Sequence, residues 1–195
     1  MFGGAVFFSF FCHFLSPNKT LLLPKTENFM TEKEALRQLD ETAEQALLEA
    51  LEFVREEGSN KLLLKSIHLL AITENKQVQK KCIKLLEDLK EDASAQVLAE
   101  TLDQQEYASI HPMLLSACWK NGRDFSDYLS VFIHHFVDQP FETAFDAFTV
   151  IEQQPLSPNQ ASEALLELKE QQHAISQEKE ALSSQLAKLL KSRIH

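Results

Sequence analysis

The chain has 195 residues, 44% of them hydrophobic and 25% charged, which is typical of a globular protein and excludes disorder as its main state. The formal net charge is −10: residues 1–29 carry +1, residues 30–157 carry −11 and residues 158–195 carry 0. An acidic body repels phosphate backbones and anionic lipids, so we expect no nucleic-acid partner. Only four glycines occur, which disfavours phosphate-binding loops and favours helices.

The first fifteen residues are strongly apolar, but this stretch is shorter than the roughly 20 residues that a membrane-spanning helix needs. It also lacks the basic start of a signal peptide, because the first lysine is Lys19. A helical pattern begins directly after Met30, so we hypothesise that the native protein starts there and that residues 1–29 are not part of it. The alternatives are a membrane or export role, which requires residues 1–15 to be genuine, and an ordinary packed segment.

From Thr31 onward, apolar residues recur at three- and four-residue steps, and this spacing predicts one amphipathic helix after another. Thr31 and Glu34 have the spacing of a capping box at the first helix. Pro112 lies inside a helical pattern, where it either kinks the helix or occupies its first turn. The expected helices cover residues 31–58, 61–73, 76–90, 94–104, 106–122, 124–138 and 140–153. The last of these is expected to present Phe141, Ala144, Phe145, Phe148 and Ile151 on its apolar face.

Three stretches, residues 72–86, 102–116 and 136–150, share a pattern in which a second helix follows a short polar turn. Aligning them at steps of 29 and 34 residues superposes three sets: Val78, Tyr107 and Phe141; Cys82, His111 and Phe145; Leu85, Leu114 and Phe148. A period near thirty with two helices per unit is typical of a helical solenoid, because each pair can bury its apolar faces only against the next pair.

The run from Leu98 to Gln153 is similar to repeats of the HEAT/armadillo type, with the acidic-polar turns LDQQEY and VDQPFE standing where such repeats turn between their two helices. The resemblance covers about residues 60–153, with residues 31–58 as a capping element. Its period is shorter than the family's usual value of about 40. The resemblance implies an all-α, right-handed stack of helix pairs over residues 30–154 with a curved surface that binds other macromolecules, usually without catalysis.

Residues 155–195 have no aromatic residue and no glycine, and Ser157–Pro158 is a helix start signal. Nothing breaks the helical pattern from there to Arg193, which predicts a single long helix with a weakened coiled-coil seam, polar at Gln172 and Lys179. Its candidate interface consists of Leu165, Leu168, Ile175, Leu182, Leu186 and Leu189. A homodimer, a pairing with another protein's helix and a lone solvated helix all remain open.

Residues with metal-binding or catalytic potential occur without the partners that such chemistry needs. His134 and His135 are adjacent, so on a helix their side chains point about 100° apart and cannot easily share one ion with Asp138. Glu170 and His173 have the Glu-x-x-His spacing of di-iron bundles, but in a single copy. We therefore predict no metal site and no cofactor.

No catalytic residues are predicted either. His111, Trp119 and Lys120 could reach a groove, but local spacing places no acid or base beside them. The cysteines, whose count is odd and whose spacing is wide, are expected to be buried reduced thiols: Cys12, Cys82 and Cys118.

One charged cluster is either a solvated face or a patch that attracts a basic partner: Glu87, Asp88, Glu91 and Asp92. Taken together, the patterns predict a cytoplasmic, non-enzymatic adaptor or assembly scaffold whose partner is another protein. The alternatives are a helical-repeat enzyme, such as a lyase, and a membrane-associated assembly factor.

Overall fold

The computed structural model describes residues 30–57, 59–91 and 93–194, so the hypotheses about residues 1–29 and the prediction for Cys12 lie outside the described residues. Within these ranges the secondary structure is helical without a strand, which confirms the all-α class. The α-helices are α1 (Glu32–Gln38), α2 (Glu44–Glu57), α3 (Asn60–Ile72), α4 (Lys76–Glu87), α5 (Ala93–Leu102), α6 (His111–Asn121), α7 (Leu129–Asp138), α8 (Phe141–Gln153), α9 (Pro158–Glu170) and α10 (Glu180–Ile194). Short 3-10 segments are η1 (Gln105–Ile110), η2 (Ser126–Tyr128), η3 (Gln172–Ala174) and η4 (Gln177–Lys179).

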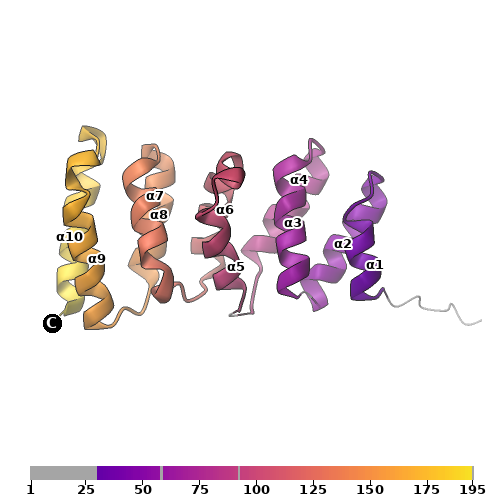
Figure 1. Cartoon of the computed structure of the whole chain (residues 1–195), viewed down its shortest axis with the longest axis horizontal. Helices are drawn as coiled ribbons and strands as arrows, with labels where there is room; N and C mark the ends of the chain where they lie inside the picture. The colour runs from indigo at the N-terminus through magenta and orange to yellow at the C-terminus, as the bar shows by residue number, and fades with distance from the viewer. Residues whose placement is uncertain (1–29, 58, 92, 195) are drawn as a thin grey trace, which may run out of the picture.

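The described helices follow one another in a single row of pairs, from α1–α2 at one end to α9–α10 at the other (Figure 1). Contacts between helices of successive pairs divide the row into two layers. The helices α2, α4, α6, α8 and α10 pack in sequence against one another and form what we call the even layer. The helices α1, α3 and α5, and likewise α7 and α9, pack in sequence to form the odd layer.

Several helix ends have the caps that the sequence predicts. The Thr31 hydroxyl accepts a hydrogen bond of 3.3 Å from the Glu34 amide, and the Glu34 carboxylate accepts one of 3.0 Å from the Thr31 amide, which confirms the capping box of α1. Ser157 and Gln160 form the same reciprocal cap at α9. Gly122 ends α6 with φ 61°, a left-handed conformation that glycine adopts without the steric cost of a Cβ. These residues set where the helices begin and end.

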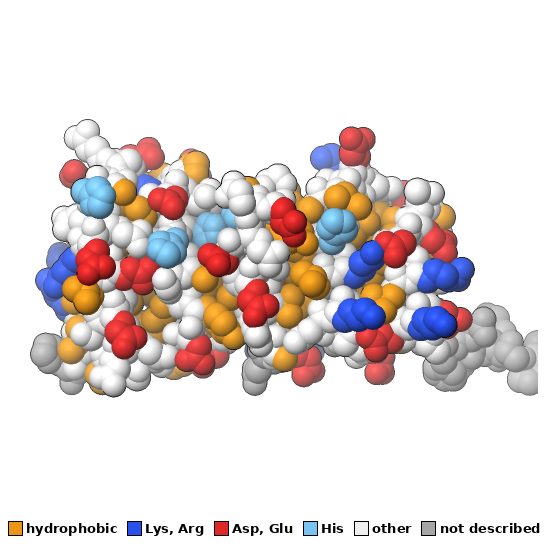
Figure 2. All heavy atoms as spheres, in the orientation of Figure 1, with side chains coloured by type: hydrophobic (Ala, Val, Ile, Leu, Met, Phe, Trp, Pro, Cys, Tyr) orange, Lys and Arg blue, Asp and Glu red, His pale blue; other side chains and the backbone are white. Residues whose placement is uncertain are grey.

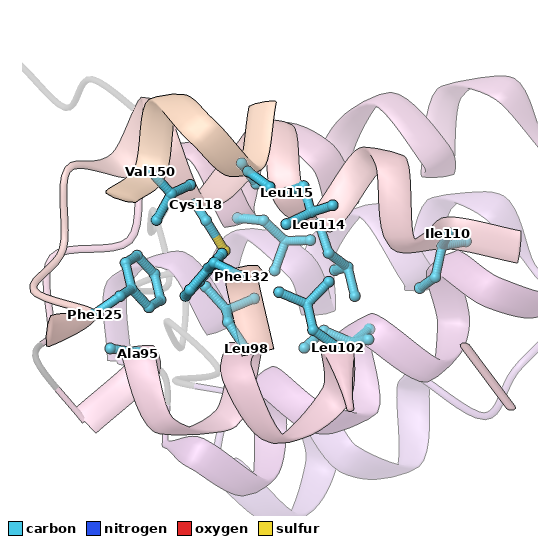
Figure 3. Close-up of a cluster of buried hydrophobic side chains, with 14 of the residues drawn as sticks. Ala95, Leu98, Leu102, Ile110, Leu114, Leu115, Cys118, Phe125, Phe132 and Val150 are labelled. Atoms are coloured by element: carbon cyan, nitrogen blue, oxygen red, sulfur yellow. The ribbon is translucent and has the colours of Figure 1, made fainter. Parts of the chain in front are cut away.

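The core is one hydrophobic cluster that runs along the row between the two layers. Figure 3 shows its middle, where Leu98 of α5, Leu114 of α6 and Phe132 of α7 lie together. Cys82 and Cys118 are buried free thiols, as predicted. Burial raises the pKa of Cys82 to about 12, so this thiol stays protonated and unreactive at neutral pH.

The alignment of the three second helices is not reproduced in the structure. Tyr107 lies in η1, ahead of α6, whereas Val78 and Phe141 lie inside α4 and α8. Pro112 occupies the first turn of α6, where a missing amide hydrogen is tolerated, so it does not kink the helix. The second unit therefore starts its α-helix later than the sequence pattern indicates, because a 3-10 segment takes up the residues before Pro112.

The expectation of one helix from Pro158 to Arg193 is wrong. The first helix, α9, ends at Glu170, residues 171–179 make a turn with η3 and η4, and α10 packs back against α9. The residues assigned to a coiled-coil seam lie within this hairpin: Leu165, Leu168, Leu182 and Leu186 are buried, and Ile175 and Leu189 are half-buried. The turn lets α9 pack on α7 and α10 pack on α8, and such tertiary burial stabilises helices more than the continuity of an isolated one.

Candidate functional site

The even layer has a polar contact between each pair of successive helices. Because alternate helices of the row run in the same direction, these contacts show which residues of neighbouring helices stand level with one another. The contacts are the ion pair of Glu52 with Lys81, the ion pair of Glu87 with Lys120 at 2.7 Å, the hydrogen bond of 3.0 Å from the Trp119 indole to the Asp146 carboxylate, and the bonds of Arg193 to the carbonyl oxygens of Glu152 and Gln154.

Within this layer, α8 exposes a row of stacked aromatic rings. The ring centroids of Phe141 and Phe145 lie 6.5 Å apart and those of Phe145 and Phe148 lie 6.1 Å apart, with an interplanar angle of 23° in each case. Phe141 is 38% exposed, Phe145 is 49% exposed, and Phe148 is buried. We call these three residues the phenylalanine ridge. The prediction that Phe141 and Phe145 face the core is therefore wrong.

The helix α8 has two apolar stripes, and the one with smaller side chains faces inward. Ala144, Ala147 and Ile151 are fully buried, and the alanines let α8 pack closely on α6 and α7. Phe145 and Phe148 each directly follow one of these alanines in sequence and hence lie about 100° away from it on the helix. Sequence periodicity alone missed the ridge, because it cannot tell which of two adjacent apolar stripes is buried.

The neighbours of the ridge on both sides are small or flexible. Because the Trp119–Asp146 bond sets the register of α6, Met113 stands level with the start of α8, and it is 37% exposed. The Arg193 contacts set the register of α10 in the same way and place Ala181 and Gln185, both exposed, level with the ridge. Uncharged side chains on two neighbouring helices therefore stand level with the exposed rings of Phe141 and Phe145, whereas the exposed Lys188 of α10 stands level with Phe148.

The predicted acidic patch is present but largely paired within the chain. Glu87 accepts a hydrogen bond from Lys120 at 2.7 Å, and Asp88 accepts one from Lys84 at 2.8 Å. Glu91 is exposed, and Asp92 lies outside the described residues. Glu87, Asp88 and Glu91 line a cavity of about 970 Å³ between the α2–α3 and α4–α5 turns, together with basic and apolar side chains. Two of these carboxylates are thus already neutralised, which weakens the patch as a binding site.

The row also has an uneven charge distribution. Residues 94–194 include fourteen acidic residues against seven basic ones, a net charge of −7, whereas residues 30–93 include fourteen against ten, a net charge of −4. On the face that Figure 2 shows, lysine and arginine side chains gather over the end formed by α1 to α3, whereas acidic side chains predominate over the middle. The half of the row that carries the phenylalanine ridge is therefore the more acidic half.

The histidines near the centre of the row form a buried pair. The rings of His111 and His135 lie 4.8 Å apart, edge to face. The Nε2 atom of His111 lies 3.2 Å from the carbonyl oxygen of Gln104, and that of His135 lies 3.0 Å from the carbonyl oxygen of Leu102. Burial lowers the pKa of both histidines, so both are neutral at pH 7 and their Nε2 atoms donate to these carbonyls. This pair joins η1, α6 and α7 to the end of α5.

The remaining candidates are dispersed over the surface. His134 is exposed and lies 3.3 Å from the Glu167 carboxylate, while His135 points into the core, so the two adjacent histidines do not share a site. His173 is exposed, and its Nδ1 atom lies 3.1 Å from the carbonyl oxygen of Glu170. Among residues 30–57, 59–91 and 93–194, no group of three or more His, Cys, Asp or Glu side chains is placed to hold a metal ion. Nor is any described helix long and apolar enough to span a bilayer.

No protein-family model matches the chain, and searches of curated proteins and of solved structures returned no significant match. The function must therefore be inferred from the surfaces themselves. The phenylalanine ridge stands out among these surfaces, because it exposes two phenylalanine rings on adjacent turns of one helix.

Proposed function

We propose that this protein is a non-enzymatic adaptor or assembly scaffold that binds another protein through the even layer of its helix row. The observation that supports this proposal is the phenylalanine ridge, whose two exposed rings are stacked on successive turns of α8. Burying a phenylalanine side chain contributes about 1.5–3 kcal/mol, and aromatic residues are enriched in the cores of protein interfaces. The exposed rings of Phe141 and Phe145 would supply that energy on binding.

The arrangement of the helices supports the same proposal. A row of helix pairs in two layers offers an extended surface, and stacked repeats of this kind commonly use such surfaces for binding. We also propose that the row is a short solenoid of the HEAT type, on the basis of its paired helices and short turns. The buried reduced thiols of Cys82 and Cys118 favour a cytoplasmic protein.

The two alternative functions have weaker support. A lyase-like enzyme needs an acid or base held beside a substrate pocket, but Glu87 and Asp88 in the 970 Å³ cavity are engaged by lysines. The Nε2 atoms of the buried histidines His111 and His135 bond to main-chain oxygens. A membrane-associated assembly factor depends on residues 1–15, which lie outside the described residues.

The proposal is tested by co-purification from the native cell with the tagged full chain and two variants. Phe145→Ser removes an exposed ring of the ridge, and Leu166→Ser removes an isolated leucine of α9 that is 58% exposed. We expect a stoichiometric partner, identified by mass spectrometry, that is retained by Leu166→Ser and lost or strongly reduced with Phe145→Ser. If the unmodified chain captures no stoichiometric protein, the adaptor function is rejected.

A further inference from the structure

We propose that the phenylalanine ridge binds a basic amphipathic helix, a helical segment of the partner with apolar side chains on one face and lysine or arginine flanking them. This inference rests on the proposed function, because it specifies the partner chemistry for the same surface. Three observations support it: the charges around the ridge, the geometry of its rings, and the form of the neighbouring helices.

Exposed acidic side chains stand at the start of α8. Asp138 ends α7 and Glu142 lies on α8 beside the ridge, and both are exposed, whereas the exposed Lys188 of α10 stands level with Phe148 at the far end of the ridge. Lys179, next in sequence to Glu180, is buried, and its ammonium group points to main-chain oxygens of α7. Lys120 on α6 is bonded to Glu87. A partner with basic flanks is attracted to this surface, whereas an acidic one is repelled.

The geometry of the ridge suits a helix better than an extended peptide. Between its first and last turns the main-chain groups of α8 are bonded within the helix, and the described residues contain no strand, so there is no sheet edge to which an extended segment could add. Phe141 and Phe145 are four residues apart and form a ridge of the kind that fits the groove between side chains of another helix.

The neighbours of the ridge leave room for such a helix. Met113 on α6 and Gln185 on α10 are flexible side chains, and Ala181 on α10 is small and exposed. Packed helices lie about 8–10 Å apart, so a helix crossing α6, α8 and α10 spans about 20 Å. About 14 residues suffice for this length at 1.5 Å per residue.

The probe for the test is a synthetic 16-residue helical peptide without tryptophan, with leucine on one face and lysine elsewhere. One matched peptide has glutamate in place of lysine, and another has the same composition in scrambled order, without an apolar face. Binding to the full chain is followed through the emission of Trp119, the chain's single tryptophan, whose indole is bonded to Asp146 beside the ridge. Titration calorimetry gives the affinity independently.

We expect the lysine peptide to bind, to gain helicity and to bind more weakly as salt concentration rises. Phe145→Ser should weaken binding at least tenfold, Phe141→Ser should weaken it several-fold, and Leu166→Ser should leave it unchanged. The glutamate and scrambled peptides should not bind measurably. The inference is overturned if the ridge substitutions leave the affinity unchanged, or if the glutamate or scrambled peptide binds as tightly as the lysine peptide.

Two other occupants of the ridge would also overturn it. If the chain's own first 29 residues cover the ridge, cross-linking mass spectrometry of the full chain will join Lys19 or Lys25 to Lys120 or Lys188. If a second copy covers it, sedimentation will show a dimer that Phe145→Ser dissociates. Failure of the lysine peptide, with a ridge-dependent partner still captured from the cell, rejects the basic helix and leaves the adaptor function standing.

Discussion

The ammonium group of Lys179 donates a hydrogen bond of 3.0 Å to the carbonyl oxygen of Phe136 in the last turn of α7. It also donates to the carbonyl oxygens of Val137 and Gln139, the latter at 2.8 Å. The last carbonyls of a helix have no partner within it, and a cation there interacts favourably with the helix dipole. A lysine from the turn between α9 and α10 thus caps a helix some forty residues earlier and ties the last pair of the row to the one before it.

Replacing Lys179 with methionine tests this tie. The methionine stem occupies similar space but leaves the α7 carbonyl oxygens without their donor, and unsatisfied buried groups cost about 1–3 kcal/mol each. Because these effects are not additive, we expect a total loss of about 3 kcal/mol in the free energy of unfolding. Urea denaturation followed by circular dichroism measures it. The matched control is Lys188→Met on the exposed surface of α10, which should change stability by less than about 0.5 kcal/mol. Equal effects of the two substitutions would contradict the capping role.

Local signals in the sequence were sufficient to place three helix ends, but they did not reveal that the expected helix of residues 31–58 is divided into α1 and α2. The capping box of Thr31 and Glu34, the start at Ser157 and Pro158, and the stop at Gly122 each act through residues close in sequence, so pattern alone reveals them. The same is true of the all-α class, which follows from periodicity over many residues.

Features that depend on contacts between distant residues could not be predicted in this way. Residues 171–179 contain neither glycine nor proline, so no local signal marks the turn between α9 and α10. Lys179 looked like a destabilising polar residue in a coiled-coil seam, because its partners in α7 are about forty residues away. The phenylalanine ridge was missed for a related reason: only packing against α6 and α7 decides which stripe of α8 is buried.

The hairpin of α9 and α10 predicts different roles for two leucines on α9. Leu168 is 2% exposed and packs in the hairpin, whereas Leu166 is 58% exposed. We expect Leu168→Ala to lower the free energy of unfolding by about 2–4 kcal/mol, independently of protein concentration, because it leaves a cavity inside one chain. Leu166→Ala should change it by less than about 1 kcal/mol. If the loss with Leu168→Ala grows on dilution and light scattering shows a change in mass, Leu168 lies in an interface between chains instead.

The pair of His111 and His135 predicts a loss of stability at mildly acidic pH. Burial lowers the pKa of both side chains in the folded protein, although Asp138 partly opposes this for His135, and His134 adds to it. As the pH falls below about 6.5, the unfolded chain binds protons that the folded chain does not, so folding stability decreases. Each histidine steepens this decrease by up to about 1.4 kcal/mol per pH unit.

Urea denaturation between pH 7.5 and 5.0 measures this dependence. His135→Gln keeps a donor for the Leu102 carbonyl oxygen but does not titrate, so the variant should have a shallower slope than the unmodified protein. His173→Gln, at an exposed position in η3, provides the control and should leave the slope unchanged. Identical slopes for all three proteins would mean that the buried pair does not contribute to the pH dependence.

The exposure of Phe145 predicts that its removal affects binding more than folding. Its ring is 49% exposed and stacks on the rings of Phe141 and Phe148, whereas Phe132 of α7 is fully buried and packs edge to face with Phe125. We expect Phe132→Ala to lower the free energy of unfolding by about 3–5 kcal/mol and Phe145→Ser to lower it by about 1 kcal/mol or less, since only a partly exposed ring is lost. Urea denaturation of both variants at neutral pH provides the comparison. A loss above about 3 kcal/mol with Phe145→Ser would place its ring in the core, and the decreased binding expected of this variant would then report on folding instead of on a binding surface.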